Sequence, residues 1–291
     1  MKFVLIGGAG FIGSELALGL ERKNHEVTII DNFNYDQKPW FPPGIKVIRD
    51  SIENIKTHGT VVGDADYVFF MASPRLNEIN DLPQPLPYYQ CLIDTTELVS
   101  SKAQLIFFSS CSVYGFQNNI VNEHSPTKIT SLYSKLKIDS EKLLTNLGDD
   151  RFKIIRLSTL YGVSSVSRND LLINNFVKDI KFSKYLEVYD PLAWRPNILL
   201  EDLVKVLVDL SEHKKFMPIL NIGFDELNIT KQDLVLTLVS KNRFDFTVKY
   251  YAPQDSRSYK VDFSLLKSLL SFSNFTEYKD GIQQVNEAYG R

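Results

Sequence analysis

The chain has 291 residues, a formal net charge of −2 and a hydrophobic content of 44%. This length and composition allow one large domain, or one large and one small domain, with a sizeable core. A charge so near zero excludes a long-range attraction to nucleic acid or anionic membranes, so an anionic ligand would need local arginines.

The first predicted element is a short buried strand over residues 3–6, which ends at a cluster of glycines. Apolar residues then recur at helical spacing, so the glycines lie at a strand-to-helix turn. Gly7 can adopt the angles of a tight turn, Gly10 leaves room for a pyrophosphate, and Gly13 lets the helix pack closely on the strand. The amide groups at the helix start would face the phosphates. The predicted contacts with the cofactor at this turn are Gly7, Gly10, Phe11, Ile12 and Gly13.

The second predicted strand, residues 26–30, ends at Asp31, about 20 residues beyond the glycines. An acidic side chain there can accept hydrogen bonds from both hydroxyls of an adenosine ribose, and it would repel a 2′-phosphate. The alternative is a loop carboxylate that caps the next turn. The order of strand, glycines, helix, strand and acid predicts a dinucleotide site that prefers NAD to NADP, with Asn32 beside Asp31.

The third and fourth predicted strands, residues 45–48 and 66–71, add further candidate contacts with the cofactor. Asp50, after the third strand, either contacts the adenine edge or caps the helix that follows. Small residues after the fourth strand would let the backbone pass close to the cofactor. The predicted contacts from these two strand ends are Asp50, Ser51, Met71, Ala72 and Ser73. Residues 74–87 contain four prolines and predict a loop at the mouth of the site.

The later elements continue the alternation of strands and helices. Helices are predicted at residues 88–101 and 131–147, and strands at 104–108 and 152–155. Such alternation predicts an α/β fold with a parallel, doubly wound (Rossmann) sheet that binds ligands at the carboxyl ends of its strands.

Tyr133 and Lys137 are four residues apart and therefore share one face of the second of these helices. A nearby ammonium stabilises a phenolate, so the pKa of Tyr133 is predicted to fall toward the range useful for a base. A serine at the end of the neighbouring strand, Ser109 or Ser110, could bind the same substrate oxygen. This trio suits hydride transfer from a secondary alcohol to a nicotinamide. A chance helical spacing and turn-forming serines are the alternatives.

Taken together, these motifs resemble those of extended short-chain dehydrogenases/reductases, in the NAD-dependent sugar-nucleotide epimerase/dehydratase family. The matching motifs are Gly-Gly-Ala-Gly-Phe-Ile-Gly at 7–13, Asp31-Asn32, Ser-Cys-Ser-Val-Tyr-Gly at 110–115, Glu-His-Ser-Pro at 123–126, Tyr-Ser-Lys-Leu-Lys at 133–137, Arg-Leu-Ser-Thr-Leu-Tyr-Gly at 156–162, Ile-Asn-Asn-Phe at 173–176, Trp-Arg-Pro at 194–196, Asn-Ile-Gly at 221–223 and Asp-Ser-Arg-Ser-Tyr at 255–259. The resemblance implies Ser110, Tyr133 and Lys137 as catalytic residues, with Ser110 selected over Ser109, and NAD as the cofactor. It also implies a homodimer formed through the helices at 88–101 and 131–147.

The resemblance further implies two regions and a nucleotide-sugar substrate. Residues 1–162 and 198–223 would form the cofactor domain, and 163–197 and 224–291 a smaller α/β C-terminal region over the substrate. The implied substrate contacts are Ser112, Asn174, Asn175, Arg195 and Arg257. A guanidinium forks onto phosphate oxygens, although either arginine could instead serve a structural ion pair.

Departures from the family pattern argue against some of the reactions that members of this family catalyse. Cys111-Ser112 replaces the Asp-Glu pair of many 4,6-dehydratases, so that elimination is not expected. Cys91 stands near a position where relatives usually carry an asparagine. Cys111 could be a general acid, as in similar epimerase-reductases, but those prefer NADP and use a histidine partner. Asp31 argues against NADP, and residues 125–212 contain no histidine.

We therefore expect an NAD-dependent epimerase that acts on a nucleoside diphosphate sugar through a transient keto-sugar and reversible hydride transfer. A net dehydrogenase or keto-sugar reductase is the first alternative, and a non-catalytic dinucleotide-sensing protein is the second. We expect neither a metal site nor a nucleic-acid partner. The two cysteines favour a reducing compartment, and we expect a cytoplasmic protein without signal peptide or membrane span.

Overall fold

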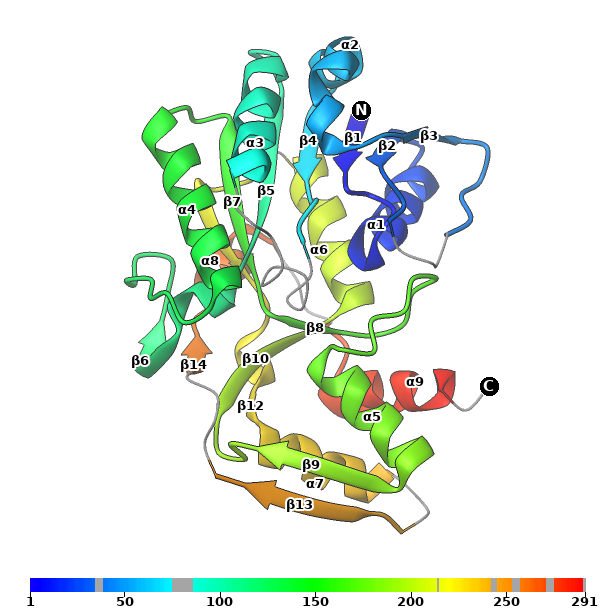
Figure 1. The fold of residues 1–291 in the computed structure, drawn as a ribbon, viewed down its shortest axis with the longest axis vertical. Helices are drawn as coiled ribbons and strands as arrows, with labels where there is room; N and C mark the ends of the chain where they lie inside the picture. Colours follow the sequence, from blue (N-terminus) through cyan, green and yellow to red (C-terminus); the bar gives the residue numbers. More distant parts are fainter. Residues whose placement is uncertain are drawn as a thin grey trace.

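A parallel sheet forms the centre of the molecule (Figure 1). The computed structural model describes residues 1–34, 39–74, 86–213, 215–241, 245–252, 257–270 and 275–289. The strands of this sheet are β1 (Lys2–Ile6), β2 (Glu26–Asp31), β3 (Ile45–Arg49), β4 (Tyr67–Phe70), β5 (Gln104–Ser110), β7 (Phe152–Leu157) and β11 (Ile219–Ile222). They lie in the order β11-β7-β5-β4-β1-β2-β3, with every neighbouring pair parallel. The order reverses between β1 and β4, where such sheets bind ligands, and the doubly wound α/β fold is thereby confirmed.

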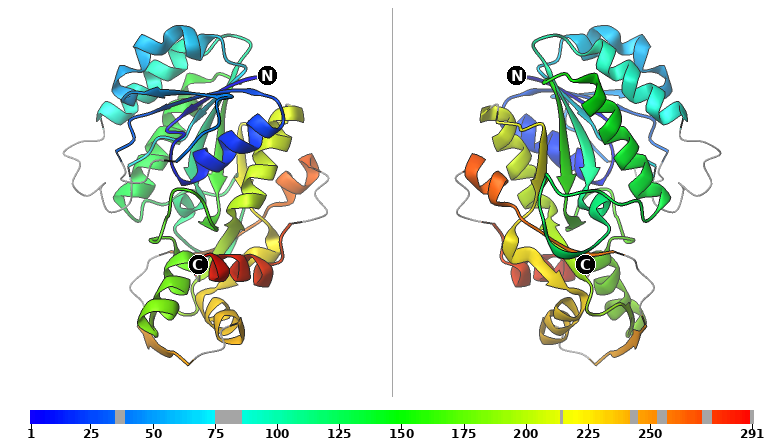
Figure 2. Two further views of the ribbon diagram at one scale, coloured as in Figure 1. Left: turned by 90° about the vertical axis from the view of Figure 1, so that its right-hand side faces the viewer. Right: turned by 90° about the vertical axis from the view of Figure 1, so that its left-hand side faces the viewer.

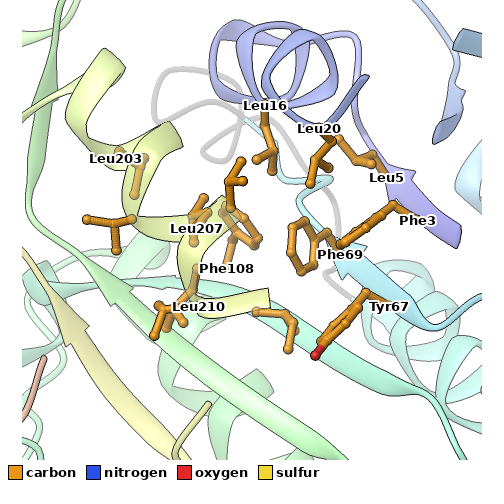
Figure 3. Packing of buried hydrophobic residues seen from close by; sticks show 14 of the residues in the cluster. Phe3, Leu5, Leu16, Leu20, Tyr67, Phe69, Phe108, Leu203, Leu207 and Leu210 are labelled. Atoms are coloured by element: carbon orange, nitrogen blue, oxygen red, sulfur yellow. The ribbon is translucent and has the colours of Figure 1, made fainter. Parts of the chain in front are cut away.

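Helices cover both faces of this sheet, as Figure 2 shows. One face carries α1 (Phe11–Arg22) and α6 (Leu200–His213), and the other carries η1 (Ile52–His58), α2 (Gly59–Gly63), α3 (Leu86–Leu98) and α4 (Leu132–Leu147). Successive strand residues point to opposite faces. Phe3 and Leu5 of β1 therefore join the core under α1 and α6, shown in Figure 3, whereas Val4 and Ile6 join the core under α3 and α4. Burial on both faces explains why these strands are apolar throughout.

A smaller group of elements lies below the carboxyl ends of the strands (Figure 1). Its strands are β8 (Thr159–Tyr161), β9 (Tyr185–Tyr189), β10 (Trp194–Leu199), β12 (Asn228–Thr230) and β13 (Thr247–Tyr251), and its helices are α5 (Leu172–Ser183), α7 (Lys231–Lys241) and α9 (Tyr278–Ala288). β10 pairs with β8 and β12, and β9 pairs with β13. These elements share their own apolar cluster, which includes Ile173, Val188 and Leu234.

One late segment returns to the main body. β14 (Ser258–Val261) pairs in parallel with β6 (Phe116–Val121), and α8 (Ser264–Leu269) follows it. Tyr259 and Val261 of β14 pack on Cys111 and Tyr114 of η2 (Cys111–Tyr114), the turn that follows β5. A further short 3-10 turn, η3, spans Asp225–Leu227.

The boundaries of the two regions implied by the resemblance stay a prediction.

The predicted bounds of the strands agree with the observed ones to within two residues. α3 begins at Leu86, inside the predicted loop, and ends at Leu98 rather than at residue 101. β6 is not predicted from the sequence, because most of its residues are exposed and show no alternation of apolar and polar side chains. Residues 35–38 and 75–85 of the predicted loops lie outside the described residues.

Neither a membrane-spanning helix nor a metal cluster occurs in the described ranges. No helix there combines the length and apolar character needed to cross a membrane. No three or more His, Cys, Asp or Glu side chains gather there as metal ligands would. Leu86 of α3 and Leu132 of α4 expose 62% and 51% of their surfaces, and they belong to the two helices expected at a homodimer interface.

Candidate active site

A large cavity opens at the carboxyl ends of the central strands, between the sheet and the smaller group of elements. Its volume of about 1060 Å³ lies at the upper end of the range of about 300–1,000 Å³ that is usual for small-molecule sites. The turn from β1 into α1 and the ends of β2, β4, β5 and β7 line one side. Arg168, Asn175, Arg195, Lys231 and Arg257 line the other side.

The glycine turn leaves space at one position and forbids a side chain at two others. Gly7 has φ +78°, and a Cβ there would lie 2.5 Å from the backbone of Ala72. A Cβ on Gly13 would lie 2.6 Å from the backbone of Gly8, so close packing of α1 requires glycine. At Gly10 a Cβ would have its nearest neighbour at 3.8 Å, and no side chain of the described residues caps the start of α1 at this position. Uncapped amides with room beside them suit a pyrophosphate.

Asp31 serves the turn and lines the cavity as well. Its Oδ2 accepts a hydrogen bond from the Ala9 amide at 2.9 Å, and its Oδ1 accepts one from the Phe33 amide at 2.8 Å. Each carboxylate oxygen has a second lone pair, so both can still accept a ribose hydroxyl. Asp31 can therefore bind the adenosine ribose and cap the turn at the same time. Asn32, beside it, also lines the cavity.

Asp31→Ala is expected to weaken NAD binding about tenfold or more, since hydrogen bonds to a charged group contribute about 1.5–3 kcal/mol. Binding of NADP should weaken much less, because the carboxylate that repels its 2′-phosphate is gone. Isothermal titration with both dinucleotides measures the two affinities. Asp31→Asn is the control, as it keeps an acceptor but not the charge, and an unchanged preference for NAD in both variants would contradict the ribose assignment.

Of the other predicted cofactor contacts, four line the cavity and one does not. Ser51, Met71, Ala72 and Ser73 are part of its wall. Asp50 is not part of that wall. Its Oδ1 accepts hydrogen bonds from the Ser51 amide and Asn54 Nδ2, both at 2.7 Å, and its Oδ2 lies 2.8 Å from His58 Nε2. Asp50 therefore stabilises the start of η1, as in the capping alternative, and its contact with the adenine edge stays a prediction.

The predicted trio comes together at the end of β5. A capping box between Ser131 and Ser134 fixes the first turn of α4, which carries Tyr133. Lys137 Nζ donates a hydrogen bond to the Phe108 carbonyl at 2.8 Å and lies 5.7 Å from the centre of the Tyr133 ring. Ser110 faces the Tyr133 hydroxyl and acts to lower the pKa of Tyr133. All three residues line the cavity.

The electrostatics of Tyr133 differ from the expectation. Burial raises the pKa of Tyr133, while Arg168, the hydrogen bond with Ser110, and Arg257 act to lower it. Burial also lowers the pKa of Lys137 to about 7. The predicted fall of the phenol pKa is thus wrong for the protein alone, because removing the phenolate from water costs more than the nearby charges return.

The two neighbouring serines have different surroundings. Ser109 is buried and its Oγ donates to Glu141 Oε1 at 2.5 Å, whereas Ser110 Oγ accepts from the Ser112 amide at 3.1 Å and faces Tyr133. This geometry favours Ser110, the serine that the resemblance implies. Ser112 lines the cavity, and its buried Oγ has no hydrogen-bond partner among the described residues, as expected for a group that meets a ligand.

Burial keeps both cysteines as protonated thiols, and it separates Cys111 from the cavity. Cys111 is fully buried, is absent from the cavity wall and donates its thiol to the Arg156 carbonyl at 3.3 Å. Burial raises the pKa of this thiol far above its usual value. Cys91 lines the cavity, but burial raises its pKa to about 11. The suggested general-acid role of Cys111 is therefore withdrawn.

Of the remaining substrate contacts implied by the resemblance, three line the cavity and one does not. Asn175, Arg195 and Arg257 line the cavity. Asn174 does not, because its amide side chain is buried and bonds the backbone of Gly162, donating to the carbonyl at 2.9 Å and accepting from the amide at 3.1 Å. Asn174 therefore connects α5 to the end of β8, and its role as a substrate contact is withdrawn.

Reasoning from the sequence misses two of the cations in the cavity wall, Arg168 and Lys231. Arg168 binds Asp170 through two hydrogen bonds of 2.7 Å, and its charge lowers the pKa of Tyr133. Lys231 is almost buried and donates to the Tyr189 carbonyl at 2.8 Å. Arg168 lies in a segment without periodicity, and Lys231 is the first residue of α7, so neither belongs to a recognisable motif. Residues 255 and 256 of the last predicted motif lie outside the described residues.

Comparisons with known proteins agree with this arrangement. The family model described as NAD dependent epimerase/dehydratase family matches residues 3–223. UDP-glucose 4-epimerase of Corynebacterium glutamicum is 28% identical over 155 positions, which cover 50% of this chain and 46% of that enzyme. UDP-glucuronic acid decarboxylase 6 of Arabidopsis thaliana is 23% identical over 317 positions, which cover 99% of this chain and 89% of that enzyme.

Solved structures share the whole fold. The UDP-glucuronic acid 4-epimerase from Bacillus cereus, in complex with UDP-glucuronic acid and NAD, has a TM-score of 0.85 at 23% identity and covers 99% of this chain and 100% of that chain. TunA, an NAD dependent NDP-hexosamine 5,6-dehydratase, has a TM-score of 0.86 at 21% identity and covers 99% and 97%. These likenesses concern the fold, whereas the family match extends over most of the sequence. The protein therefore belongs to the NAD dependent epimerase/dehydratase family, a family of enzymes whose cofactor is NAD.

Proposed function

We propose that the protein is an NAD-dependent epimerase of a nucleoside diphosphate sugar. The observation that carries this proposal is the grouping of Tyr133, Ser110 and Lys137 in the wall of the cavity, where the buried Lys137 amine lies 5.7 Å from the centre of the Tyr133 ring. One end of this cavity suits a dinucleotide, and the other end carries cationic side chains.

The chemistry divides between the cofactor and the side chains. Bound NAD accepts a hydride and can return it. Tyr133 would take the proton from a hydroxyl of the sugar ring, and Ser110 would hold the oxygen from which that proton leaves. Lys137, when charged, would stabilise the phenolate during this step. Return of the proton from Tyr133 after the sugar has turned would complete an epimerisation without net oxidation.

Support for an epimerase over a dehydratase comes from the acidic side chains. In the described part of the cavity wall they are Asp31, Glu53 and Asp170. Asp31 is held at the glycine turn, Glu53 follows β3, and Asp170 binds Arg168. An elimination would need an acid–base pair beside the reacting carbon, because general acid–base catalysis requires a group within hydrogen-bond reach of the proton. The side chains around Tyr133 are instead hydroxyls and cations.

A nucleotide sugar is supported by charge and by the relatives. Arg195, Arg257 and Lys231 give the far end of the cavity three cations, which suits a diphosphate. The Bacillus cereus enzyme was solved with UDP-glucuronic acid, and the Corynebacterium glutamicum enzyme is named for UDP-glucose. We propose these two UDP sugars as the first substrates to test.

The test is incubation of the protein with NAD and either UDP sugar, followed by chromatographic separation of the 4-epimers. An epimerase produces the epimer while the absorbance of NADH stays low. Stoichiometric NADH would support the alternative of a net dehydrogenase, and loss of carbon dioxide from UDP-glucuronic acid would indicate a decarboxylase. The absence of any product from a broad panel of nucleotide sugars would overturn the proposal in favour of a binding protein.

A further inference from the structure

Glu141 lies one helical turn beyond Lys137 on α4, and the two residues are 5% and 2% exposed. Residues four apart on a helix are neighbours on one face. Glu141 is not part of the cavity wall. It is therefore a buried carboxylate behind the site, next to the lysine that lines the cavity.

Two anchors on neighbouring strands fix this carboxylate. Glu141 Oε2 accepts a hydrogen bond from Arg156 Nη2 at 2.7 Å, and its Oε1 accepts one from Ser109 Oγ at 2.5 Å. Ser109 of β5 and Arg156 of β7 are direct partners in the sheet register. The carboxylate thus connects α4 to both strands beside the end of β5, where Ser110 lies.

Arg156 forms a buried ion pair with this carboxylate. The guanidinium is itself 4% exposed, and its Nη1 donates to the Tyr114 hydroxyl at 3.0 Å. Tyr114 in turn donates to Asn221 Oδ1 at 2.7 Å. An arginine does not lose its proton in proteins, so the Glu141 carboxylate has a permanent cation as its partner in a buried ion pair.

The other neighbours of the Lys137 amine carry no negative charge. Its hydrogen bond goes to the Phe108 carbonyl, and it lies 4.9 Å from the centre of the Phe107 ring. Burial lowers the pKa of Lys137, and Glu141 acts in the opposite direction.

The titratable groups on the surrounding elements do not replace this charge. Tyr133 on α4, Tyr88 on α3 and Cys91 on α3 have pKa values raised by burial, so they are neutral near pH 7. Arg156 on β7 is a cation paired with Glu141. Among the described groups, Glu141 is therefore the source of negative charge for the lysine.

We propose that Glu141 is a positioning residue of this site, whose buried carboxylate favours the charged form of the Lys137 amine beneath Tyr133. Its consequence for turnover rests on the proposed function, since a charged Lys137 is what stabilises the phenolate there. Its electrostatic effect concerns the protein alone and is measured without substrate or cofactor.

The test is an NMR titration of the protein labelled with carbon-13 at the lysine ε-carbons, with the Lys137→Met spectrum identifying the signal of Lys137. The wild-type midpoint is expected near pH 7. In Glu141→Gln it should fall by about one pH unit or more, as for a buried group that loses a nearby opposite charge. An unchanged midpoint would overturn the inference.

Two further variants separate charge from packing. Arg156→Lys disturbs the same buried pair but keeps the carboxylate, and Glu141→Asp restores the charge on a shorter side chain, so both should titrate closer to wild type than Glu141→Gln. If Glu141→Gln fails to fold because Arg156 is left unpaired, the double variant Glu141→Gln/Arg156→Gln removes both charges, and its midpoint should also fall below that of wild type. A midpoint in the double variant equal to wild type would again overturn the inference.

The two proposals fail separately. A shifted midpoint in a protein that converts no nucleotide sugar would leave Glu141 assigned and reject the epimerase. Epimerisation by the wild-type protein, together with a Lys137 midpoint that is unchanged in Glu141→Gln, would support the epimerase and reject the role of Glu141.

Discussion

Tyr133→Phe is expected to reduce turnover by about 10²- to 10⁴-fold, the usual contribution of a positioned acid–base group. The variant removes only the hydroxyl that faces Ser110, and the ring can still pack over the Lys137 amine, 5.7 Å from the ring centre in the wild-type protein. Binding of NAD should change little, because the glycine turn and Asp31 are untouched. Steady-state epimerisation rates and a thermal-shift titration with NAD measure the two effects.

Tyr89→Phe is the matched control for this variant. Tyr89 is on α3, its hydroxyl donates to Asp139 at 3.3 Å, and it is not part of the cavity wall. Loss of that hydroxyl should leave turnover near the wild-type rate. Wild-type turnover in Tyr133→Phe would reject Tyr133 as the base and would assign that role to another group in the cavity wall.

Lys137→Met is expected to stabilise the folded protein at acidic pH while it abolishes turnover. Burial lowers the pKa of Lys137 to about 7, against 10.5 for an exposed lysine. Between these values the unfolded chain binds a proton that the folded protein does not bind. The contribution of Lys137 to the free energy of unfolding therefore rises with pH through this window. Below it, the full cost of burying the ammonium is present, on the order of a few kcal/mol.

Methionine fills a similar volume without a charge, although the Phe108 carbonyl then loses its donor at a cost of about 1–3 kcal/mol. We expect the free energy of unfolding of Lys137→Met to exceed that of wild type by about 2 kcal/mol near pH 6. This difference should shrink toward pH 10. Urea unfolding without NAD at both pH values measures it. The control is Lys135→Met, which removes an exposed lysine paired with Asp139 and should show no such dependence on pH. A wild type that is the more stable protein at pH 6 would contradict the assigned burial cost.

The sheet and the glycine turn were predictable because their signals are local. Each central strand is a short apolar run, and the positions of Gly7, Gly13 and Asp31 depend on backbone geometry within one strand–helix–strand unit. The placement of Tyr133 and Lys137 on one helix face followed from helical spacing alone. Features of this kind need no knowledge of the rest of the fold.

Other features depend on contacts between distant segments, which no local pattern encodes. The raised pKa of Tyr133 reflects burial by several elements, and Arg168 enters the cavity from an irregular segment. The choice between Asn174 and Asn175 depends on which one meets the backbone of Gly162. Glu141 has an ordinary helical position in the sequence, and its anchors on Ser109 and Arg156 are recognisable only when β5 and β7 are paired.

The pairing of β14 with β6 has a consequence for the order in which the chain can mature. Residues 258–261 supply the partner strand of residues 116–121 and the cover over Cys111 and Tyr114. During synthesis, β6 and the turn over Cys111 and Tyr114 stay uncovered until residues 258–261 have left the ribosome, on the order of seconds to a minute after β6 itself emerges. A nascent chain that has completed residues 3–223, the segment matched by the family model, thus still lacks the strand that pairs with β6.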